Sequence, residues 1–356
     1  MPKIVILTEG KSNPADAKTA TGILRYNPED VAAILDSTCT GKTAHDVFGV
    51  GGTIPFISEL KQAQADTLLI GIAPPGGVLP PAWKKIIREA LTAGMHIISG
   101  LHYLLDDDPE FHELAERHGV RIQDLRRVPS DIAVSKNVAK DLGCHRVHTV
   151  GHDCSVGKMV ASIELCRALD SRGYGSKFVA TGQTGIMIDG SGVPVDRVIG
   201  DFVAGSIEEQ VLKHKDAEFV VIEGQGSLVH PLYSGVTLGL LHGCAPQTMV
   251  LVFDPARKTL RSTSHPVPPL SAVIQCFEDL ASFITPSKVV ALAANTASLS
   301  ASEADAAVKR TEDELGLVTS DLIRHGSDRI IDAIVARHVE LRLNRNGDNR
   351  GKSATP

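Results

Sequence analysis

The residues best suited to chemistry lie in a short segment bounded by glycines. Its sequence is Gly151-His152-Asp153-Cys154-Ser155-Val156-Gly157-Lys158-Met159. It follows a short apolar run at 147–150 and precedes a stretch with the periodicity of an amphipathic helix. The first turn of a helix leaves its backbone N–H groups unpaired, so such a loop can direct several of them at one anion. The segment therefore predicts a phosphate-binding loop, with Lys158 as a mobile cation.

This loop departs from the common phosphate-loop pattern in two ways. Five residues rather than four separate Gly151 from Gly157, a spacing similar to that of the dethiobiotin synthetase branch of P-loop proteins. Met159 stands where a Ser or Thr hydroxyl would bind magnesium, and a thioether is a poor ligand for a hard cation. We expect a phosphate site with a weakened or absent magnesium site, and no resident metal. A chance Gly-Lys turn at a helix start is the alternative.

A second candidate segment follows the apolar run that ends at residue 222. Glu223 is expected at the carboxyl end of this strand, where it could act as a general base. His230 is a second candidate base, because its reference pKa lies near neutrality. Gln225 and Gly226, in the open loop between them, are expected to contact a bound cofactor. A structural role for the carboxylate and the imidazole is the alternative.

The remaining candidates are polar residues in loops. Gln183 follows the strand expected at 177–181, and Asn295 follows the one expected at 288–293, so both are expected to contact the cofactor. Carboxylates suit an ammonium group, and guanidinium groups bind carboxylates through two parallel hydrogen bonds. On this basis the candidates for binding an amino-acid substrate are Arg25, Asp196, Asp201 and Arg257. Solvated loop side chains are the alternative.

Cys154 is a further candidate because a thiol near a helix start can have a lowered pKa and act as a nucleophile. The sequence assigns it no histidine partner. Covalent catalysis is therefore kept as an alternative.

Composition limits the class of function. The chain has 356 residues, 43% of them hydrophobic, a length typical of about two domains. Its formal net charge of −6 argues against a nucleic-acid or membrane-surface binder, since both need a basic surface. Its six cysteines form no CxxC pair, and its apolar runs are too short for a signal peptide or a membrane span. We expect a cytoplasmic protein with no nucleic-acid or membrane partner.

The elements that must position these residues alternate between strands and helices, which predicts an α/β fold with mostly parallel sheets. Strands are expected at 3–7, 31–35, 67–72, 96–99, 145–150, 177–181, 218–223, 248–254 and 288–293. Helices are expected between most of them, including one at 54–64. No GxGxxG follows the first strand, which argues against a nicotinamide site. A polar, proline-closed stretch at 121–129 predicts a boundary between a domain at 1–125 and one at 130–343, with a disordered tail at 344–356.

Three segments together resemble a bacterial and archaeal two-domain family long catalogued as a domain of unknown function. They are the loop at 151–159, Ala-Pro-Pro-Gly-Gly at 73–77 and Glu-Gly-Gln-Gly-Ser-Leu-Val-His-Pro at 223–231. The resemblance covers nearly the whole chain. It implies a Rossmann-like N-terminal domain and a P-loop NTPase-like C-terminal domain. Members of the family include D-glutamate N-acetyltransferases, so it also implies acetyl-CoA as co-substrate, D-glutamate as substrate and a role in D-amino-acid catabolism. We also expect a homo-oligomer.

An acetyltransferase activity suits the residues because coenzyme A carries phosphates but undergoes no phosphoryl transfer. The missing magnesium hydroxyl would then have no consequence. We expect the D-glutamate amine to attack the thioester directly, with Glu223 as the first candidate base and His230 as the second. Two alternatives stay open, namely an ATP-dependent small-molecule kinase or ligase and a non-catalytic nucleotide sensor.

Overall fold

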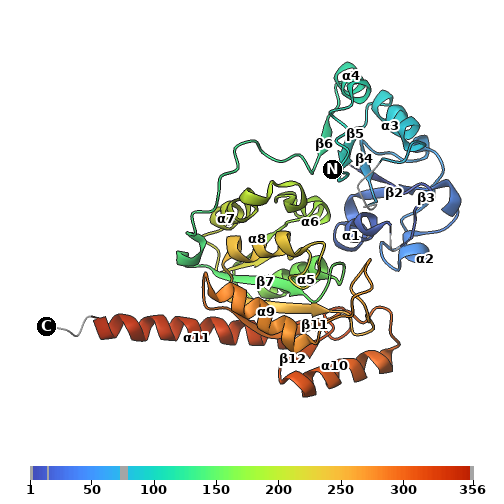
Figure 1. Ribbon diagram of the computed structural model, residues 1–356. Helices are drawn as coiled ribbons and strands as arrows, with labels where there is room; N and C mark the ends of the chain where they lie inside the picture. The colour runs from blue at the N-terminus through green and yellow to red at the C-terminus, as the bar shows by residue number, and fades with distance from the viewer. Residues whose placement is uncertain (1–2, 14–15, 73–78, 353–356) are drawn as a thin grey trace. The chain divides into compact units, whose positions relative to one another are not determined.

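The computed structural model describes residues 3–13, 16–72 and 79–352, with side chains as far as residue 344. The chain divides into two compact units. Unit 1 comprises Met1–Pro129 and Gly182–Arg197, and unit 2 comprises Ser130–Thr181 and Val198–Pro356. Each unit contains one six-stranded parallel sheet, which confirms the predicted α/β class (Figure 1).

The sheet of unit 1 has the strand order β3-β2-β1-β4-β5-β6. This is the order of the doubly wound dinucleotide-binding fold. Every neighbouring pair is parallel, and the strands are short and largely buried because helices cover both faces. The strands are β1 (Ile4–Leu7), β2 (Val31–Leu35), β3 (Phe56–Ile57), β4 (Thr67–Ile70), β5 (His96–Ser99) and β6 (Ile122–Asp124).

Helices cover the two faces of this sheet with separate apolar clusters. On one face α1 (Lys18–Tyr26) and α2 (Ala44–Phe48) pack against alternate strand residues. On the other face α3 (Trp83–Thr92) and α4 (Pro109–His118) do so, with Trp83 buried. Short 3-10 turns complete the unit: η1 (Pro28–Asp30), η2 (Ser37–Cys39) and η3 (Leu60–Gln62).

Gly182–Arg197 belongs to unit 1 although it lies within the range expected for the second domain. The sequence predicted a loop here, whereas Gln183–Asp189 forms helix α6 and Val195–Arg197 a 3-10 turn, η6. Met187 and Ile188 of α6 pack into the same cluster as α1, and the buried hydroxyls of Thr19 and Thr184 lie 3.0 Å apart. Apolar side chains on one face of this segment therefore explain its place in unit 1.

The sheet of unit 2 has the order β12-β11-β10-β7-β9-β8, again parallel throughout. Its strands are β7 (His145–Gly151), β8 (Ser176–Val179), β9 (Phe219–Ile222), β10 (Thr248–Phe253), β11 (Lys288–Ala294) and β12 (Val318–Ser320). β7 is buried along its whole length, with β9 and β10 as its neighbours. The loops that follow these three strands therefore meet at one edge of the sheet.

Helices again cover both faces of the sheet. α5 (Lys158–Ser171) and α11 (Asp328–Lys352) pack on one face, and α8 (Ser234–Cys244) and α9 (Leu270–Ser282) on the other (Figure 1). The remaining elements are α7 (Val203–Lys213), α10 (Ala301–Leu315), η5 (Ala139–Asp141) and η7 (Gly200–Phe202). Within the described ranges, every helix is too short or too polar to cross a membrane.

The structure differs from the sequence prediction in two stretches, and a third predicted segment lies outside the described residues. The helix expected at 54–64 is wrong, because this stretch forms β3 and η3, and edge pairing of Phe56 and Ile57 with β2 competes with helix formation. Helix α11 runs to Lys352, into the range 344–356 that the sequence predicted to be disordered, and residues 353–356 lie outside the described residues. The proline-glycine segment at 73–77 also lies outside them.

Candidate functional site

The candidate site of unit 2 lies where the loops after β7, β9 and β10 meet. The loop after β7 carries the predicted phosphate-binding residues, the loop after β9 carries Glu223 and His230, and the loop after β10 carries Arg257. Parallel strands bring their carboxyl ends to one edge, where open α/β sheets bind ligands. The topology thus brings together side chains that are about a hundred residues apart in the chain.

Helix α5 begins inside this loop and presents its amino end without a cap. Gly157 precedes it at a φ of 105°, no side chain caps the first turn, and the first turn holds no acidic residue. The first N–H groups of a helix have no intrahelical acceptor, and they lie at its positive end. Ser155 is also left-handed, with a φ of 53°. This geometry is compatible with the anion site that the sequence predicts, and the anion site stays a prediction.

Lys158 is almost fully buried beneath this loop. Its Nζ donates to the backbone oxygen of Asp153 at 2.8 Å. Burial lowers the pKa of Lys158 to about 8, against the opposing influence of Cys154, Asp153 and Glu223. A bound anion would favour the charged form, because it supplies the counter-charge that burial otherwise denies.

Asp153 connects the three loops through its fully buried carboxylate. Oδ1 accepts from the N–H of Cys154 at 2.6 Å, and Oδ2 accepts from Arg257 Nη1 and from the N–H of Arg261, both at 2.8 Å. Burial alone would raise the pKa of Asp153, but these hydrogen bonds, led by that from Arg257, hold it below its ordinary value. Asp153 is therefore an ionised anchor of the loop.

Arg257 lies along the outside of the phosphate loop. Besides Asp153, its guanidinium donates to the backbone oxygen of Cys154 at 2.8 Å and to that of Ser155 at 3.5 Å. These contacts direct the carbonyl oxygens of the loop toward the Arg257 guanidinium. This arrangement is compatible with loop N–H groups that point away from Arg257, toward a bound anion. The sequence expected Arg257 to bind a substrate carboxylate, and its contacts in this structure are with the loop.

His230 is buried, and both of its ring nitrogens are engaged. Nδ1 accepts from the N–H of Leu232 at 3.2 Å, so Nε2 carries the proton and donates to the backbone oxygen of Arg261 at 2.9 Å. Nε2 also lies 3.5 Å from Asp153 Oδ1. With both nitrogens used, His230 is better placed to hold the loops together than to remove a proton.

Glu223 stands at the carboxyl end of β9, directly beside the phosphate loop. Its Oε2 accepts from the N–H of Thr181 at 2.9 Å, and its Oε1 accepts from Gln225 Nε2 at 3.3 Å. These two hydrogen bonds orient the carboxylate at the end of the strand. The next residue, Gly224, packs so closely that a Cβ there would lie 3.0 Å from Lys158 Cδ.

Other residues that the sequence predicted to contact the cofactor lie in the phosphate loop or are bonded to it. Asn295 donates through Nδ2 to the backbone oxygen of Val156 at 3.0 Å, and His152 accepts at Nε2 from the N–H of Asp254 at 3.2 Å. Burial lowers the pKa of His152 to about 4, so its imidazole is neutral near pH 7. Gly226 is left-handed at a φ of 60°, and Met159 is half-buried on α5.

Asp153, Cys154 and His230 place potential metal-ligand atoms within 4.8 Å of one another. The Asp153 oxygens already accept three hydrogen bonds, one of them from a guanidinium whose charge would oppose a metal ion. Burial, together with Asp153, raises the pKa of the Cys154 thiol above its ordinary value. We interpret the cluster as a hydrogen-bonded anchor, and the thiol as a poor candidate for a nucleophile.

Three of the predicted site residues belong to unit 1. Gln183 and Asp196 both contact Arg126, a buried residue whose Nη2 donates to Gln183 Oε1 at 2.9 Å and to Asp196 Oδ2 at 2.8 Å. Arg25 lies in the last turn of α1, beside a hollow of about 640 Å³ at the amino ends of β2 and β3. That is the edge opposite to the ligand-binding edge of such sheets. Asp201 is exposed on η7 of unit 2.

Sequence reasoning missed several supporting residues. Thr149 accepts from the N–H of Gly224 at 3.1 Å and lies 2.7 Å from the hydroxyl of Ser162, joining β7, α5 and the Glu223 loop. The sequence did offer one sign of this role for Thr149, because a hydroxyl inside a buried strand needs a hydrogen-bond partner. Arg126 was missed because nothing in its local sequence marks it as buried.

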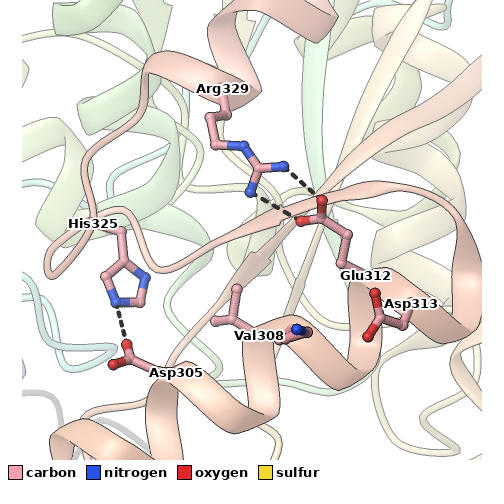
Figure 2. A pocket seen from close by; sticks show the side chains of 7 residues that line it. Asp305, Val308, Glu312, Asp313, His325 and Arg329 are labelled. Atoms are coloured by element: carbon pink, nitrogen blue, oxygen red, sulfur yellow. Dashed lines mark hydrogen bonds and ion pairs between the residues drawn. The ribbon is translucent and has the colours of Figure 1, made fainter.

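A smaller hollow of about 300 Å³ lies beside α10 in unit 2. Figure 2 shows Arg329 directed at Glu312, and His325 directed at Asp305 with 2.8 Å between Nε2 and Oδ1. These charged groups are paired with each other, so we assign no site here.

The folds of the two units and the uncapped anion cradle define a two-domain α/β protein of the P-loop class with a Rossmann-type first unit. The chain belongs to the DUF1611 family: residues 133–331 match its P-loop domain and residues 37–128 its Rossmann-like domain, both described as domains of unknown function. This confirms the resemblance seen in the sequence.

Two characterised relatives are similar to this chain over most of its length. A D-glutamate N-acetyltransferase of Tritonibacter scottomollicae is 39% identical over 322 residues, which are 90% of this chain and 94% of that protein. A protein of the same name from a Pseudoalteromonas species is 37% identical over 277 residues, 77% of this chain and 83% of its own. A crystal structure of a DUF1611 family protein from Anabaena variabilis is 36% identical with a TM-score of 0.90, covering 94% of this chain and 100% of that one.

Proposed function

We propose that this protein is a D-glutamate N-acetyltransferase that takes its acetyl group from acetyl-CoA. The observation that carries the proposal is the extended similarity to two relatives with that name. The phosphate loop supports it, because CoA offers a pyrophosphate and a ribose phosphate to an anion cradle. Met159 in place of a hydroxyl suits a ligand that is bound without phosphoryl transfer.

Glu223 is the residue we propose as general base. D-Glutamate arrives with a protonated amine, so one proton must leave before nitrogen can attack the thioester carbonyl. Glu223 takes this proton, a C–N bond forms, and the C–S bond breaks with its electron pair going to sulfur. The nitrogen then loses a second proton, which neutralises the departing CoA thiolate, and the proton on Glu223 returns to solvent.

His230, Asp153 and Arg257 act through the loop in this mechanism. Their hydrogen bonds hold the phosphate loop and the Glu223 loop in fixed positions relative to each other. This fixes the position of the thioester relative to the base. We assign no step to a metal ion. Arg25, Asp196 and Asp201 stay candidates for acceptor binding on chemical grounds alone.

The first test is release of free thiol from acetyl-CoA, with D-glutamate, L-glutamate or no amino acid. We expect D-selective release by the native protein. Lys158→Ala should lower kcat/KM for acetyl-CoA by about a hundredfold, because it removes a buried cation from the phosphate site. Lys309→Ala, which changes a lysine at the edge of the hollow beside α10, is the matched control and should leave the rate unchanged.

Two outcomes would contradict the proposal. The first is that the native protein releases no thiol with any amino acid. The second is that it hydrolyses ATP in a reaction that requires both magnesium and Lys158. The second result would favour the ATP-dependent kinase or ligase that the glycine spacing also suggests. Nucleotide binding without turnover would favour a sensor.

A further inference from the structure

Two large apolar residues follow one another in sequence in the loop between β9 and α8. Leu232 is 60% exposed and Tyr233 is 46% exposed. Two adjacent exposed apolar residues cost solvation free energy unless a ligand or partner covers them. We name Leu232 and Tyr233 the apolar pair.

The backbone of this pair is held by hydrogen bonds. The N–H of Leu232 donates to buried His230, and the N–H of Tyr233 donates to the backbone oxygen of His230 at 3.2 Å. The ring centroids of His230 and Tyr233 lie 4.8 Å apart, and Thr237 Oγ1 donates to the Tyr233 oxygen at 3.1 Å. The side chains are therefore presented on a fixed support.

His230, which supports the pair, also lies beside the phosphate loop. His230 Nε2 lies 3.5 Å from Asp153 Oδ1, within the segment that cradles the anion. Glu223, the proposed base, begins the same loop that ends with the pair, and its neighbour Gly224 packs on Lys158. A thioester ligand anchored by its pyrophosphate must extend its chain from the cradle toward Glu223.

We propose that the apolar pair contacts the pantetheine arm of the acyl-CoA donor. The inference rests on the proposed function and deepens it, because it gives the site a means of telling a CoA thioester from a nucleotide that has phosphates but no such arm. Pantetheine carries two methyl groups and methylene segments, which can cover Leu232 and the ring of Tyr233. Covering about half of a leucine side chain corresponds to roughly a tenfold gain in affinity.

The test compares CoA with adenosine 3′,5′-bisphosphate. The bisphosphate keeps the adenosine, the 3′-phosphate and the first 5′-phosphate of CoA, but it lacks the second 5′-phosphate and the pantetheine arm, so the effect of each substitution is compared ligand by ligand. Calorimetric titration would give the Kd of CoA and of adenosine 3′,5′-bisphosphate for the native protein and for Leu232→Ser. We expect the substitution to weaken CoA about tenfold and to leave the bisphosphate within about twofold. Leu232→Met, which keeps an apolar side chain, should restore CoA binding.

Phe283→Ser is the matched control, because Phe283 is another exposed apolar residue of unit 2, 78% exposed at the end of α9. It should change neither Kd. An equal loss for both ligands in Leu232→Ser, or no loss for either, would overturn the inference. A changed oligomeric state with unchanged CoA affinity would assign the pair to a subunit contact and overturn it too.

Failure of this inference is distinguishable from failure of the proposed function. A native protein that acetylates D-glutamate while Leu232→Ser binds CoA normally would overturn only the role of the pair. A native protein that neither binds CoA nor releases thiol would overturn both.

Discussion

Lys158 is nearly completely buried, and we assign its charge to anion binding, so we expect ligand binding to depend on pH. Burial lowers its pKa to about 8, so the free protein loses the charge when the pH rises through that value. An anion binds the charged form of Lys158 better than the neutral form. Above the pKa, Lys158 must therefore take up a proton when the anion binds. Each pH unit above the pKa costs up to about tenfold in affinity.

We therefore expect the Kd of adenosine 3′,5′-bisphosphate to rise between pH 8 and pH 9.5. Its phosphates are already fully ionised above pH 7, so the ligand contributes no titration in this range. Calorimetry at half-unit steps would measure the effect. Lys158→Arg is the control, because a guanidinium keeps its charge throughout. Equal affinity of the native protein at pH 7 and pH 9.5 would contradict the assignment of Lys158 to the anion site.

At the scale of elements, the site depends on how closely the Glu223 loop packs on β7. A Cβ added at Gly224 would lie 1.8 Å from the backbone oxygen of Thr149, a distance that no side chain can adopt. The Gly224 N–H donates to the Thr149 hydroxyl at 3.1 Å, so loop and strand are joined at this point. A glycine is required here by close approach of two backbones.

Gly224→Ala should therefore destabilise the protein by about 2 to 4 kcal/mol, because the loop must move away from the strand. Urea unfolding with the native protein as reference would measure this loss. Gly235→Ala is the control, since a Cβ at Gly235 in α8 meets nothing within 4 Å and alanine favours a helix. Similar urea midpoints for the two variants would contradict this prediction, because they would show that the Glu223 loop can move away from β7 without loss of stability.

At the scale of the whole molecule, the chain passes between its two units more than once, at 129–130, 181–182 and 197–198. Arg126 holds the returning segment in unit 1. Its guanidinium contacts Gln183, Asp196 and the backbone oxygen of Gly100. Because Arg126 is buried and Asp196 is only partly exposed, these bonds are shielded from water more than a surface pair would be.

Arg126→Ala is expected to lower stability by about 2 to 3 kcal/mol and to speed backbone hydrogen exchange in α6, because it leaves buried acceptors without a donor. Exchange detected by mass spectrometry would follow α6 directly. The neighbouring Arg127→Ala is the control. Arg127 pairs with Asp107 at the surface, and its loss should cost less than about 1 kcal/mol. Unchanged exchange in α6 after Arg126→Ala would refute the anchoring role.

Much of unit 2 was predictable from local patterns. The five strands expected there and the start of α5 follow from apolar runs and from the glycines around Lys158, which are local signals of a buried parallel sheet. Unit 1 was less predictable. The stretch at 54–64 has a helical pattern but forms an edge strand, because pairing with β2 outweighs local propensity.

In the candidate site, too, some features could be predicted from local sequence and others could not. Gly157, Lys158 and Met159 predict a phosphate site without a magnesium hydroxyl from type and spacing alone, because a helix start and its first side chains are set by neighbours in the chain. The roles of Asp153 and His230 could not be obtained in that way. Their partners, Arg257 and the backbone of Arg261, are brought near by the order of parallel strands.

The sequence by itself determined the α/β class and the family to which this chain belongs, and it predicted the phosphate loop. Only the tertiary structure decided which charges are free to meet a ligand and which are already paired. It turned Arg257 and His230 toward the loops, left Leu232 exposed beside them, and placed Gly182–Arg197 in unit 1. The physical reason is that burial and pairing depend on neighbours distant in the chain, which spacing along a sequence does not encode.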